Sequence, residues 1–272
     1  MNPEEYERMH ALETNYWWFA GRRAIIQSLL EYAGPLVAGG RANGSEGTQG
    51  HALELLDIGC GTGANLPMLL EIAGAGGHVV GADFSTLALR FSRDHAVAAR
   101  AQLLQADAQC LPFACESFDI VTMLDVLEHV RDDHRALAEI NRVLRPGGAL
   151  ILSVPAYQRL WSAHDEALHH FRRYEFHDLR RLLTGHGFDA SRLSFAMSMM
   201  PPLAWLWRKF VLPFKPRQPK DAKRHAEGAV LPAVPPWMNR ALVAYLRWEG
   251  RSLHRRPLRF GTSLVGTIFK RP

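Results

Sequence analysis

The stretch Leu55-Leu-Asp-Ile-Gly-Cys-Gly-Thr-Gly63 decides the fold. It begins in a short apolar run over residues 53–58, which predicts a buried strand, and it stops at three glycines. A helix over residues 65–73 is expected to follow. Glycines at a turn from strand to helix permit a tight bend and let a ligand lie against bare backbone. Taken alone, Gly59, Gly61 and Ala64 also fit the dinucleotide pattern G-x-G-x-x-G/A, so the motif leaves the ligand open.

The sequence after this stretch alternates between strands and helices. The expected strands cover residues 79–82, 102–106, 118–124 and 149–154, and the expected helices cover residues 86–98, 133–144 and 176–183. Such alternation predicts βαβ units with right-handed connections and a parallel sheet. Residues 191–197 and 263–269 are candidates for a sixth and a final strand. We therefore expect an α/β fold with a doubly wound, mostly parallel, seven-stranded sheet.

Length and composition indicate one core with additions. A chain of 272 residues is long for one domain and short for two. We expect N-terminal helices, an aromatic cluster at 16–19 and a flexible, glycine-rich linker at 34–50 within residues 1–50. The core should comprise residues 51–198 and the final strand in 261–272. Residues 199–260 form an insert between the last two strands that is longer than an ordinary loop, which indicates a function or a small subdomain.

The insert is strongly basic. The whole chain has a formal charge of +5, but residues 199–260 hold 13 Lys or Arg and three acidic residues, a local balance of +10. A basic segment on an acidic body favours an anionic partner such as lipid headgroups, a phosphorylated carrier or nucleic acid, or is simply a solvated loop. Two helices are expected, over residues 203–211 and 238–248. Their mixture of Trp, Leu, Lys and Arg fits either a membrane interface or a lid, with the apolar stripe of the second helix formed by Met238, Ala241, Leu242 and Tyr245.

Other features restrict the location of the protein. The acidic, polar N-terminus does not resemble a secretory signal. No run reaches the about 18 apolar residues that span a bilayer. The three cysteines, Cys60, Cys110 and Cys115, are too few for a disulfide framework. We therefore expect a cytoplasmic protein, and peripheral binding to the inner face of the membrane is an added hypothesis.

Aspartates follow four successive strands of the predicted sheet: Asp57, Asp83, Asp107 and Asp125. Ligands of open α/β sheets bind at the carboxyl ends of the strands. The two phosphates of a dinucleotide would be repelled by this acidic edge. S-adenosylmethionine carries a sulfonium and an ammonium and no phosphate, so an acidic, partly desolvated cleft attracts it.

Five motifs in order carry a family resemblance over residues 53–155. L-L-D-I-G-C-G-T-G and V-G-A-D-F-S are followed by A-D-A-Q-C-L-P-F, F-D-I-V-T-M-L-D-V-L-E-H-V and L-R-P-G-G-A-L-I-L-S-V-P. Together they resemble the Rossmann-like, class I S-adenosylmethionine-dependent methyltransferases, and within them a methyltransferase-11-like bacterial subgroup. The resemblance implies S-adenosylmethionine as the cofactor and S-adenosylhomocysteine as its product.

The resemblance also implies roles for individual residues. Asp57 and the turn Gly59-Cys60-Gly61 with Gly63 would hold the methionine end of the cofactor. Asp83 would accept both ribose hydroxyls, and Asp107 the adenine amino group, with backbone groups from Ala108 nearby. Phe84 and Leu111 would sandwich the adenine, unless they pack in the core. Asp125 and Val126 would begin the loop that lies under the sulfonium and faces the acceptor.

A dense group of polar and aromatic side chains follows the fifth expected strand, at residues 155–174. It resembles the signature S-V-P-A-x-x-x-L-W-S-x-H-D…H-x-R-R-Y of a bacterial methyltransferase subgroup that also carries W-W-F and R-R near its N-terminus. Such groups are costly to bury without a ligand or partners. The candidates for catalysis are His164, Asp165, His169 and Tyr174, and the candidates for acceptor binding are Tyr16, Trp17, Tyr157, Trp161 and Arg173.

If this segment is helical, Asp165 and His169 share a face at i, i+4, so Asp165 would orient His169 as a general base. His129, in L-E-H-V, is a second candidate base, or a structural histidine. A structural hydrogen-bond network is the alternative for the segment as a whole. His164, Asp165, His169 and His170 are also possible metal ligands, but no companion cluster is evident in the sequence, so we expect no metal.

The leading hypothesis is methylation, on oxygen, of a small hydrophobic or lipid-linked acceptor. A sugar or glycan precursor is the alternative acceptor. A nucleic acid is a weaker candidate, because no N-P-P-[YF]-type motif follows the fourth strand. A cofactor-binding protein without turnover and a dinucleotide oxidoreductase are the remaining alternatives.

Overall fold

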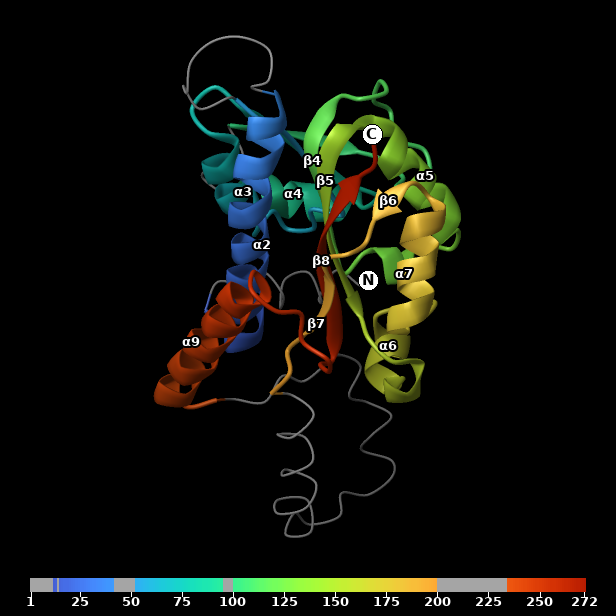
Figure 1. The fold of residues 1–272 in the computed structure, drawn as a ribbon. Coiled ribbons are helices and arrows are strands. Elements are labelled where there is room, and N and C mark those ends of the chain that lie inside the picture. The colour runs from blue at the N-terminus through green and yellow to red at the C-terminus, as the bar shows by residue number, and fades with distance from the viewer. Residues whose placement is uncertain (1–11, 14, 42–51, 95–99, 200–233) are drawn as a thin grey trace.

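The computed structural model describes residues 12–13, 15–41, 52–94, 100–199 and 234–272. Its centre is a single sheet in the order β3-β2-β1-β4-β5-β8-β6, with β7 also paired to β8 (Figure 1). The central strands are β1 (Glu54–Ile58), β2 (His78–Asp83), β3 (Ala101–Gln105), β4 (Phe118–Leu124), β5 (Leu144–Pro155) and β8 (Ser263–Lys270). The first five are parallel, and the order reverses between β1 and β4. The doubly wound α/β prediction is confirmed.

The sixth strand is broken into two pieces. β6 (Phe188–Asp189) and β7 (Leu193–Ala196) both pair antiparallel with β8. Asp189 lies opposite Phe269 and Leu193 opposite Gly266, so this side of the ladder contains one extra residue, as in a β-bulge. The eight strand segments therefore correspond to the seven strands expected from the sequence.

Helices cover both faces of the sheet (Figure 1). α2 (Trp17–Arg41) and α3 (Leu66–Ala73) pack on one face, and α5 (Asp133–Val143) and α7 (Phe176–Gly185) on the other. α4 (Thr86–Asp94) contacts β2 and β3. Short helices, η1 (Leu127–His129), η2 (Gln158–Leu160) and α6 (Ala163–Ala167), follow the carboxyl ends of β4 and β5. These ends therefore carry the polar segments that the sequence singled out.

The first part of the expected linker is helical instead. α2 continues through Gly34 and Pro35 to Arg41, so residues 34–41 are helical, and residues 42–50 lie outside the described part. Burial explains the difference, because Ala33 and Val37 are buried in the apolar layer between α2 and the sheet. Tertiary packing thus outweighs the low helix propensity of glycine and proline.

The insert contributes α9 (Pro236–Leu253), which packs along α2. The two helices approach closely at glycines: a Cβ on Gly21 would lie 2.2 Å from Leu246 Cδ1, and one on Gly250 would lie 2.9 Å from Ile25 Cα. The expected helix at 203–211 lies outside the described residues. The predicted stripe is also partly wrong, because Ala241 is exposed and the buried residues of α9 are Leu246, Glu249, Gly250 and Leu253.

Candidate functional site

The turn after β1 is shaped by its glycines. Gly59, Gly61 and Gly63 have φ angles of 71°, 56° and 86°, a region that favours glycine. A Cβ on Gly59 would lie 2.3 Å from Val126 Cγ2, so the turn lies directly against the loop after β4. This contact joins two of the segments that the resemblance assigned to one cofactor.

Asp57 has a spare acceptor atom beside this turn. Its side chain is buried, and Oδ1 accepts a hydrogen bond of 2.6 Å from Thr122 Oγ1. Oδ2 is also buried, and it has no hydrogen-bond partner. Burial raises the pKa of Asp57 to about 7, against the opposing effect of the Thr122 hydrogen bond. An unpaired buried acceptor is costly, which indicates that a ligand completes the site.

The end of β2 combines a carboxylate with an exposed ring. Asp83 accepts hydrogen bonds from the backbone N–H groups of Gly61 (2.9 Å) and Ser85 (2.8 Å), and burial raises its pKa. The next side chain, Phe84, is 73% exposed. Core packing of Phe84 is therefore excluded, and its ring is free to stack on a planar ligand. Cys60, by contrast, is buried, and burial raises the pKa of its thiol.

Asp107 and Asp125, the aspartates after β3 and β4, have different hydrogen-bond partners. Asp107 Oδ1 accepts from the backbone N–H of Gln109 at 2.9 Å, and Ala108 beside it is buried. Asp125 has a φ of 53°. Its carboxylate accepts a hydrogen bond from Ser153 Oγ and forms an ion pair with Arg22 of α2.

Sequence reasoning missed two residues that reach this edge from the N-terminal segment. Arg22 pairs with Asp125 and donates 2.9 Å to Ser153 Oγ. Glu13 is buried and accepts a hydrogen bond from Thr62 in the glycine turn. Only the W-W-F and R-R pattern of the N-terminus pointed to this region. The N-terminal segment therefore closes over both the turn after β1 and the loop after β4.

The segment after β5 is organised around Asp165, which is fully buried. Oδ1 accepts from Arg173 Nε at 2.7 Å and contacts His170 Nδ1 at 3.0 Å, and Oδ2 accepts from the N–H and hydroxyl of Ser162. Burial opposes ionisation, but these hydrogen bonds, led by Arg173, lower the pKa of Asp165 to about 2. The carboxylate is therefore a fixed anion that positions its neighbours.

The expected pair of Asp165 with His169 is wrong. α6 ends at Ala167, and His169 adopts a φ of 58°, so the i, i+4 relation of a helix does not hold. His169 is exposed, and His170 takes its place against Asp165. His164 is exposed as well.

The remaining candidates for catalysis and for acceptor binding differ in their burial. Tyr174 is buried, and its hydroxyl donates to Asp133 Oδ2 at 3.0 Å; burial and Asp133 raise its pKa. Trp17 is buried in the layer between α2 and the sheet, whereas Tyr16 and Trp161 are half-buried. Tyr157 stacks on Phe195 with ring centroids 5.2 Å apart. The contacts of Tyr174 and Trp17 are thus structural, while Tyr16, Tyr157 and Trp161 keep partly exposed rings.

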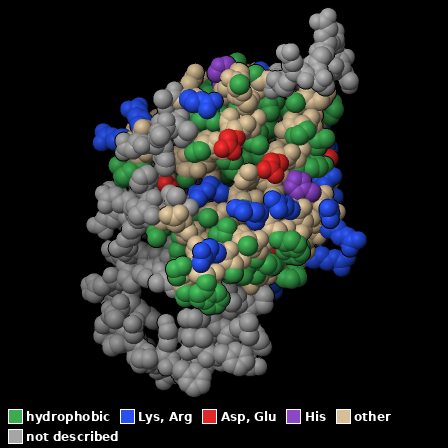
Figure 2. Space-filling view, turned by 90° about the vertical axis from the view of Figure 1, so that its left-hand side faces the viewer, with side chains coloured by type: hydrophobic (Ala, Val, Ile, Leu, Met, Phe, Trp, Pro, Cys, Tyr) green, Lys and Arg blue, Asp and Glu red, His purple; other side chains and the backbone are tan. Residues whose placement is uncertain are grey.

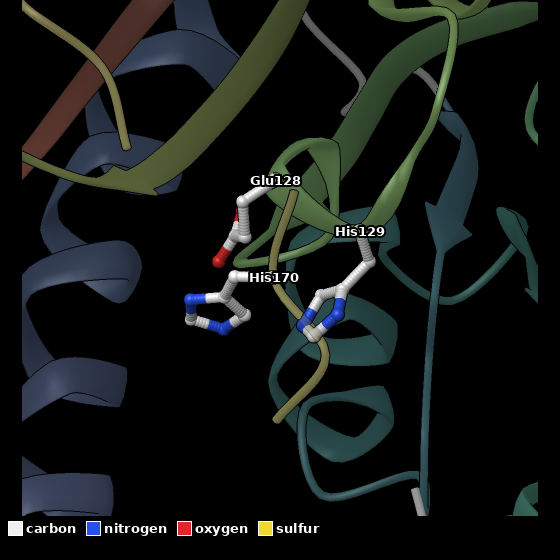
Figure 3. A group of neighbouring side chains, drawn as sticks. All are labelled: Glu128, His129 and His170. Carbon is white, nitrogen blue, oxygen red and sulfur yellow. The ribbon is translucent and has the colours of Figure 1, made fainter. Parts of the chain in front are cut away.

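His129, which ends η1 after β4, lies beside His170 of the segment after β5. Their rings meet edge to face with centroids 4.6 Å apart. Burial, and then the neighbouring His170, lower the pKa of His129 to about 4, so its imidazole is neutral near pH 7. Glu128, the preceding residue, points its carboxylate toward the two rings (Figure 3). Side chains from the β4 loop and the β5 segment therefore meet at one place.

Comparison with known proteins defines the class of the core. Residues 56–152 match the family described as methyltransferase domain. Together with the strand order and the glycine turn, this match shows that residues 56–152 are similar to the domains of class I S-adenosylmethionine-dependent methyltransferases.

Particular relatives match part of the chain. It is 34% identical to a ubiquinone/menaquinone biosynthesis C-methyltransferase UbiE of Vibrio vulnificus over 157 residues, 54% of this chain and 58% of the relative. It is 40% identical to the UbiE of Teredinibacter turnerae over 118 residues, 41% and 47% of the two chains. The chain thus spans about half the length of these relatives. In fold it is similar to phosphoethanolamine N-methyltransferase 2 of Haemonchus contortus, solved with S-adenosyl-L-methionine, with a TM-score of 0.51 and 18% identity over 84% of this chain and 50% of that one.

Proposed function

We propose that the protein transfers the methyl group of S-adenosylmethionine to a hydrophobic acceptor that carries a hydroxyl. The observation that carries the proposal is the unpaired, buried Oδ2 of Asp57 beside the glycine turn. An ammonium group would complete this acceptor, and the methionine end of S-adenosylmethionine provides one. The residues present therefore fit the cofactor that the class uses.

The remaining roles follow the carboxyl edge of the sheet. Asp83, with both oxygens fixed by backbone N–H groups, would accept the two ribose hydroxyls through its remaining lone pairs. The exposed ring of Phe84 would stack on the adenine. Asp107 and Ala108 would bind the adenine edge. Leu111 is buried in the core, so Phe84 is the exposed side chain of the two.

The rate of methyl transfer depends on how the acceptor is positioned relative to the methyl group. When bound, S-adenosylmethionine supplies an electrophilic methyl group, and methyl transfer requires a nucleophile in line with it. Holding the two partners in that geometry supplies much of the rate. The Asp125–Arg22 ion pair fixes the loop that would lie under the sulfonium. Val126 of the same loop lies against Gly59. The loop that faces the acceptor is therefore held in place against the turn that would hold the cofactor.

The aromatic residues and the relatives support a hydrophobic, ring-containing acceptor. Tyr157, Phe195 and Phe176 form a continuous stack next to the segment after β5. The matched relatives are named for ubiquinone and menaquinone biosynthesis, so we infer a quinol-like acceptor. The oxygen of its hydroxyl is our proposed accepting atom. The name of those relatives favours a ring carbon as the second candidate.

The outward face of α9 supports delivery of such an acceptor from a membrane surface. Trp237 and Trp248 are 67% and 62% exposed and lie on one face of the helix, next to Arg240, Arg247 and Arg251. Figure 2 shows hydrophobic side chains beside Lys and Arg on the face that contains α9. Exposed tryptophans flanked by cations fit a helix at the surface of an anionic bilayer. None of the described helices is long and apolar enough to cross a membrane.

A product assay tests the proposal. The protein is incubated with methyl-labelled S-adenosylmethionine and, in separate reactions, a short-chain quinol, a simple phenol and a sugar phosphate. We expect S-adenosylhomocysteine to form with the quinol and the phenol, and mass spectrometry of the product then distinguishes oxygen from carbon methylation. Turnover with the sugar phosphate alone would contradict the proposed acceptor class.

A further inference from the structure

Three possible metal ligands meet beside the proposed acceptor position. Glu128 and His129 belong to η1, after β4, and His170 follows α6, after β5. One ligand atom from each lies within 4.8 Å of the others, and Figure 3 shows the carboxylate and the two rings gathered together. The fold thus brings together residues that are far apart in the sequence. Glu128 and His129 are thus the additional ligands for His170 that the sequence pattern did not reveal.

The buried carboxylate of Glu128 also points to a bound cation. The residue is 1% exposed, and neither carboxylate oxygen has a hydrogen-bond partner among the described residues. Removing an unpaired carboxylate from water is expensive unless it is protonated, paired or bound to a metal. The neighbouring cations are already engaged, because Arg22 pairs with Asp125 and Arg173 with Asp165. Glu128 therefore has room for one more cation.

His170 is oriented for coordination. Its Nδ1 lies 3.0 Å from Asp165 Oδ1, so a proton on Nδ1 leaves Nε2 with its lone pair free. A carboxylate that holds the far nitrogen of a histidine in this way is the usual support of a metal-binding imidazole. Asp165 is held in turn by Arg173 and Ser162. The position of the ring is therefore fixed before any ion binds.

We propose that Glu128, His129 and His170 form a binding site for a divalent transition-metal ion such as Zn²⁺. One carboxylate and two imidazoles are a common three-ligand set for Zn²⁺ and Fe²⁺, with further positions left open, whereas Mg²⁺ and Ca²⁺ prefer oxygen ligands. Ligands of a tetrahedral zinc lie about 3.4 Å apart at bond lengths of about 2.1 Å. Side-chain rotations that shorten the longest separation by up to about 1.4 Å would close the site.

The open position gives the ion a role in the proposed reaction. An ion here would lower the pKa of an acceptor hydroxyl and so favour the nucleophilic oxygen. This role rests on the proposed function, but binding of the ion does not. The site is therefore tested without an acceptor.

Cobalt titration provides the test. The whole chain is freed of metal with a chelator and titrated with Co²⁺, whose visible absorption distinguishes four- or five-coordinate protein sites from the aqueous ion, and Zn²⁺ is then added as a competitor. We expect one Co²⁺ per chain, displaced by Zn²⁺. Glu128→Gln removes the charge with little change of shape, and His170→Ala removes a ligand. Each should weaken binding at least about 100-fold, beyond the loss caused by a supporting residue.

Matched measurements keep the result interpretable. His177→Ala removes an exposed histidine of α7 and should leave the Co²⁺ affinity unchanged. Thermal unfolding and S-adenosylhomocysteine binding show whether each variant is folded, and His170→Ala serves if Glu128→Gln is not. The proposal is overturned if the wild-type protein shows only the spectrum of aqueous Co²⁺, or if folded Glu128→Gln and His170→Ala bind the ion as the wild type does. Methyl transfer without any metal would leave the proposed function intact and would remove only the catalytic role of the ion.

Discussion

The aspartates at the ends of β1 and β2 keep acceptor capacity free for a ligand, whereas Asp165, in the segment after β5, is fully paired within the protein. Asp83 receives its hydrogen bonds from two backbone N–H groups, and Asp57 keeps one oxygen unpaired. Asp165 uses both oxygens on Arg173, His170 and Ser162. The first region, at the ends of β1 and β2, therefore retains hydrogen-bond acceptors for a ligand. In the second region, the segment after β5, the polar groups pair with one another and order the segment. Substitutions should separate ligand affinity from stability accordingly.

The largest effect is expected at Asp165. Asp165→Ala leaves the guanidinium of Arg173 and the ring of His170 without their buried partner. Breaking such a pair costs about 3–5 kcal/mol, so chemical denaturation should show a loss of this size. Asp178→Ala, which breaks an exposed ion pair with Arg181 on α7, is the control and should cost less than about 1 kcal/mol. Equal losses for the two variants would show that the Asp165 network does not order the segment.

Asp83→Ala should have the opposite profile. Burial raises the pKa of Asp83, which means that folding does not favour its charge, so the variant should remain folded. Loss of a charged acceptor for the ribose hydroxyls costs about 1.5–3 kcal/mol, or about 10- to 150-fold in affinity for S-adenosylmethionine. Titration calorimetry measures this change. Unchanged affinity in a folded variant would remove Asp83 from the cofactor site.

The sequence was sufficient for the first region because its determinants are local. Strand ends, glycines and the aspartates after them follow one another within a few residues, and the sheet topology follows from their alternation. The second region depends on contacts that no local pattern encodes. The pair of Asp165 with His170 rather than His169 depends on where α6 ends. Likewise, Arg22 meets Asp125, and Glu128 meets His170, only after the chain has folded.

A smaller effect should appear in the pH dependence of cofactor binding. Burial raises the pKa of Asp57 to about 7, above the value of about 3.9 for an unfolded chain. The folded protein thus holds this proton more tightly, so the contribution of Asp57 to stability falls as the pH rises from about 4 to about 7. Its anion, which attracts the ammonium of S-adenosylmethionine, is lost below about pH 7. We expect affinity to fall by up to about tenfold per pH unit below that value.

Calorimetry at about pH 5.5 and about pH 7.5 measures this difference, since the two values lie on either side of the expected pKa. Asp57→Asn should bind weakly at both and lose the dependence. A wild-type affinity that is the same at the two pH values would mean that Asp57 does not face the ammonium.

The smallest effect is expected on the outer face of α9. Replacing both Trp237 and Trp248 by Ser removes exposed rings without touching the contacts of α9 with α2. Co-sedimentation with anionic vesicles at low salt should fall by roughly three- to tenfold, and added salt should weaken the binding of the wild type. Phe260→Ser, an exposed position outside α9, is the control. Equal pelleting of the wild type with anionic and neutral vesicles would reduce α9 to a helix that supports α2.

The most direct test of the account is a crystal structure of the protein with S-adenosylhomocysteine. We expect the amino group of the ligand at Asp57 Oδ2, the ribose hydroxyls on Asp83, the adenine against Phe84, and the sulfur beside the loop at Asp125 and Val126. Because His129 follows Val126 in the same loop, we also expect the sulfur to lie near His129. A ligand bound away from the carboxyl ends of β1 and β2, or with its ribose turned away from Asp83, would contradict the central claim that this acidic edge is the cofactor site.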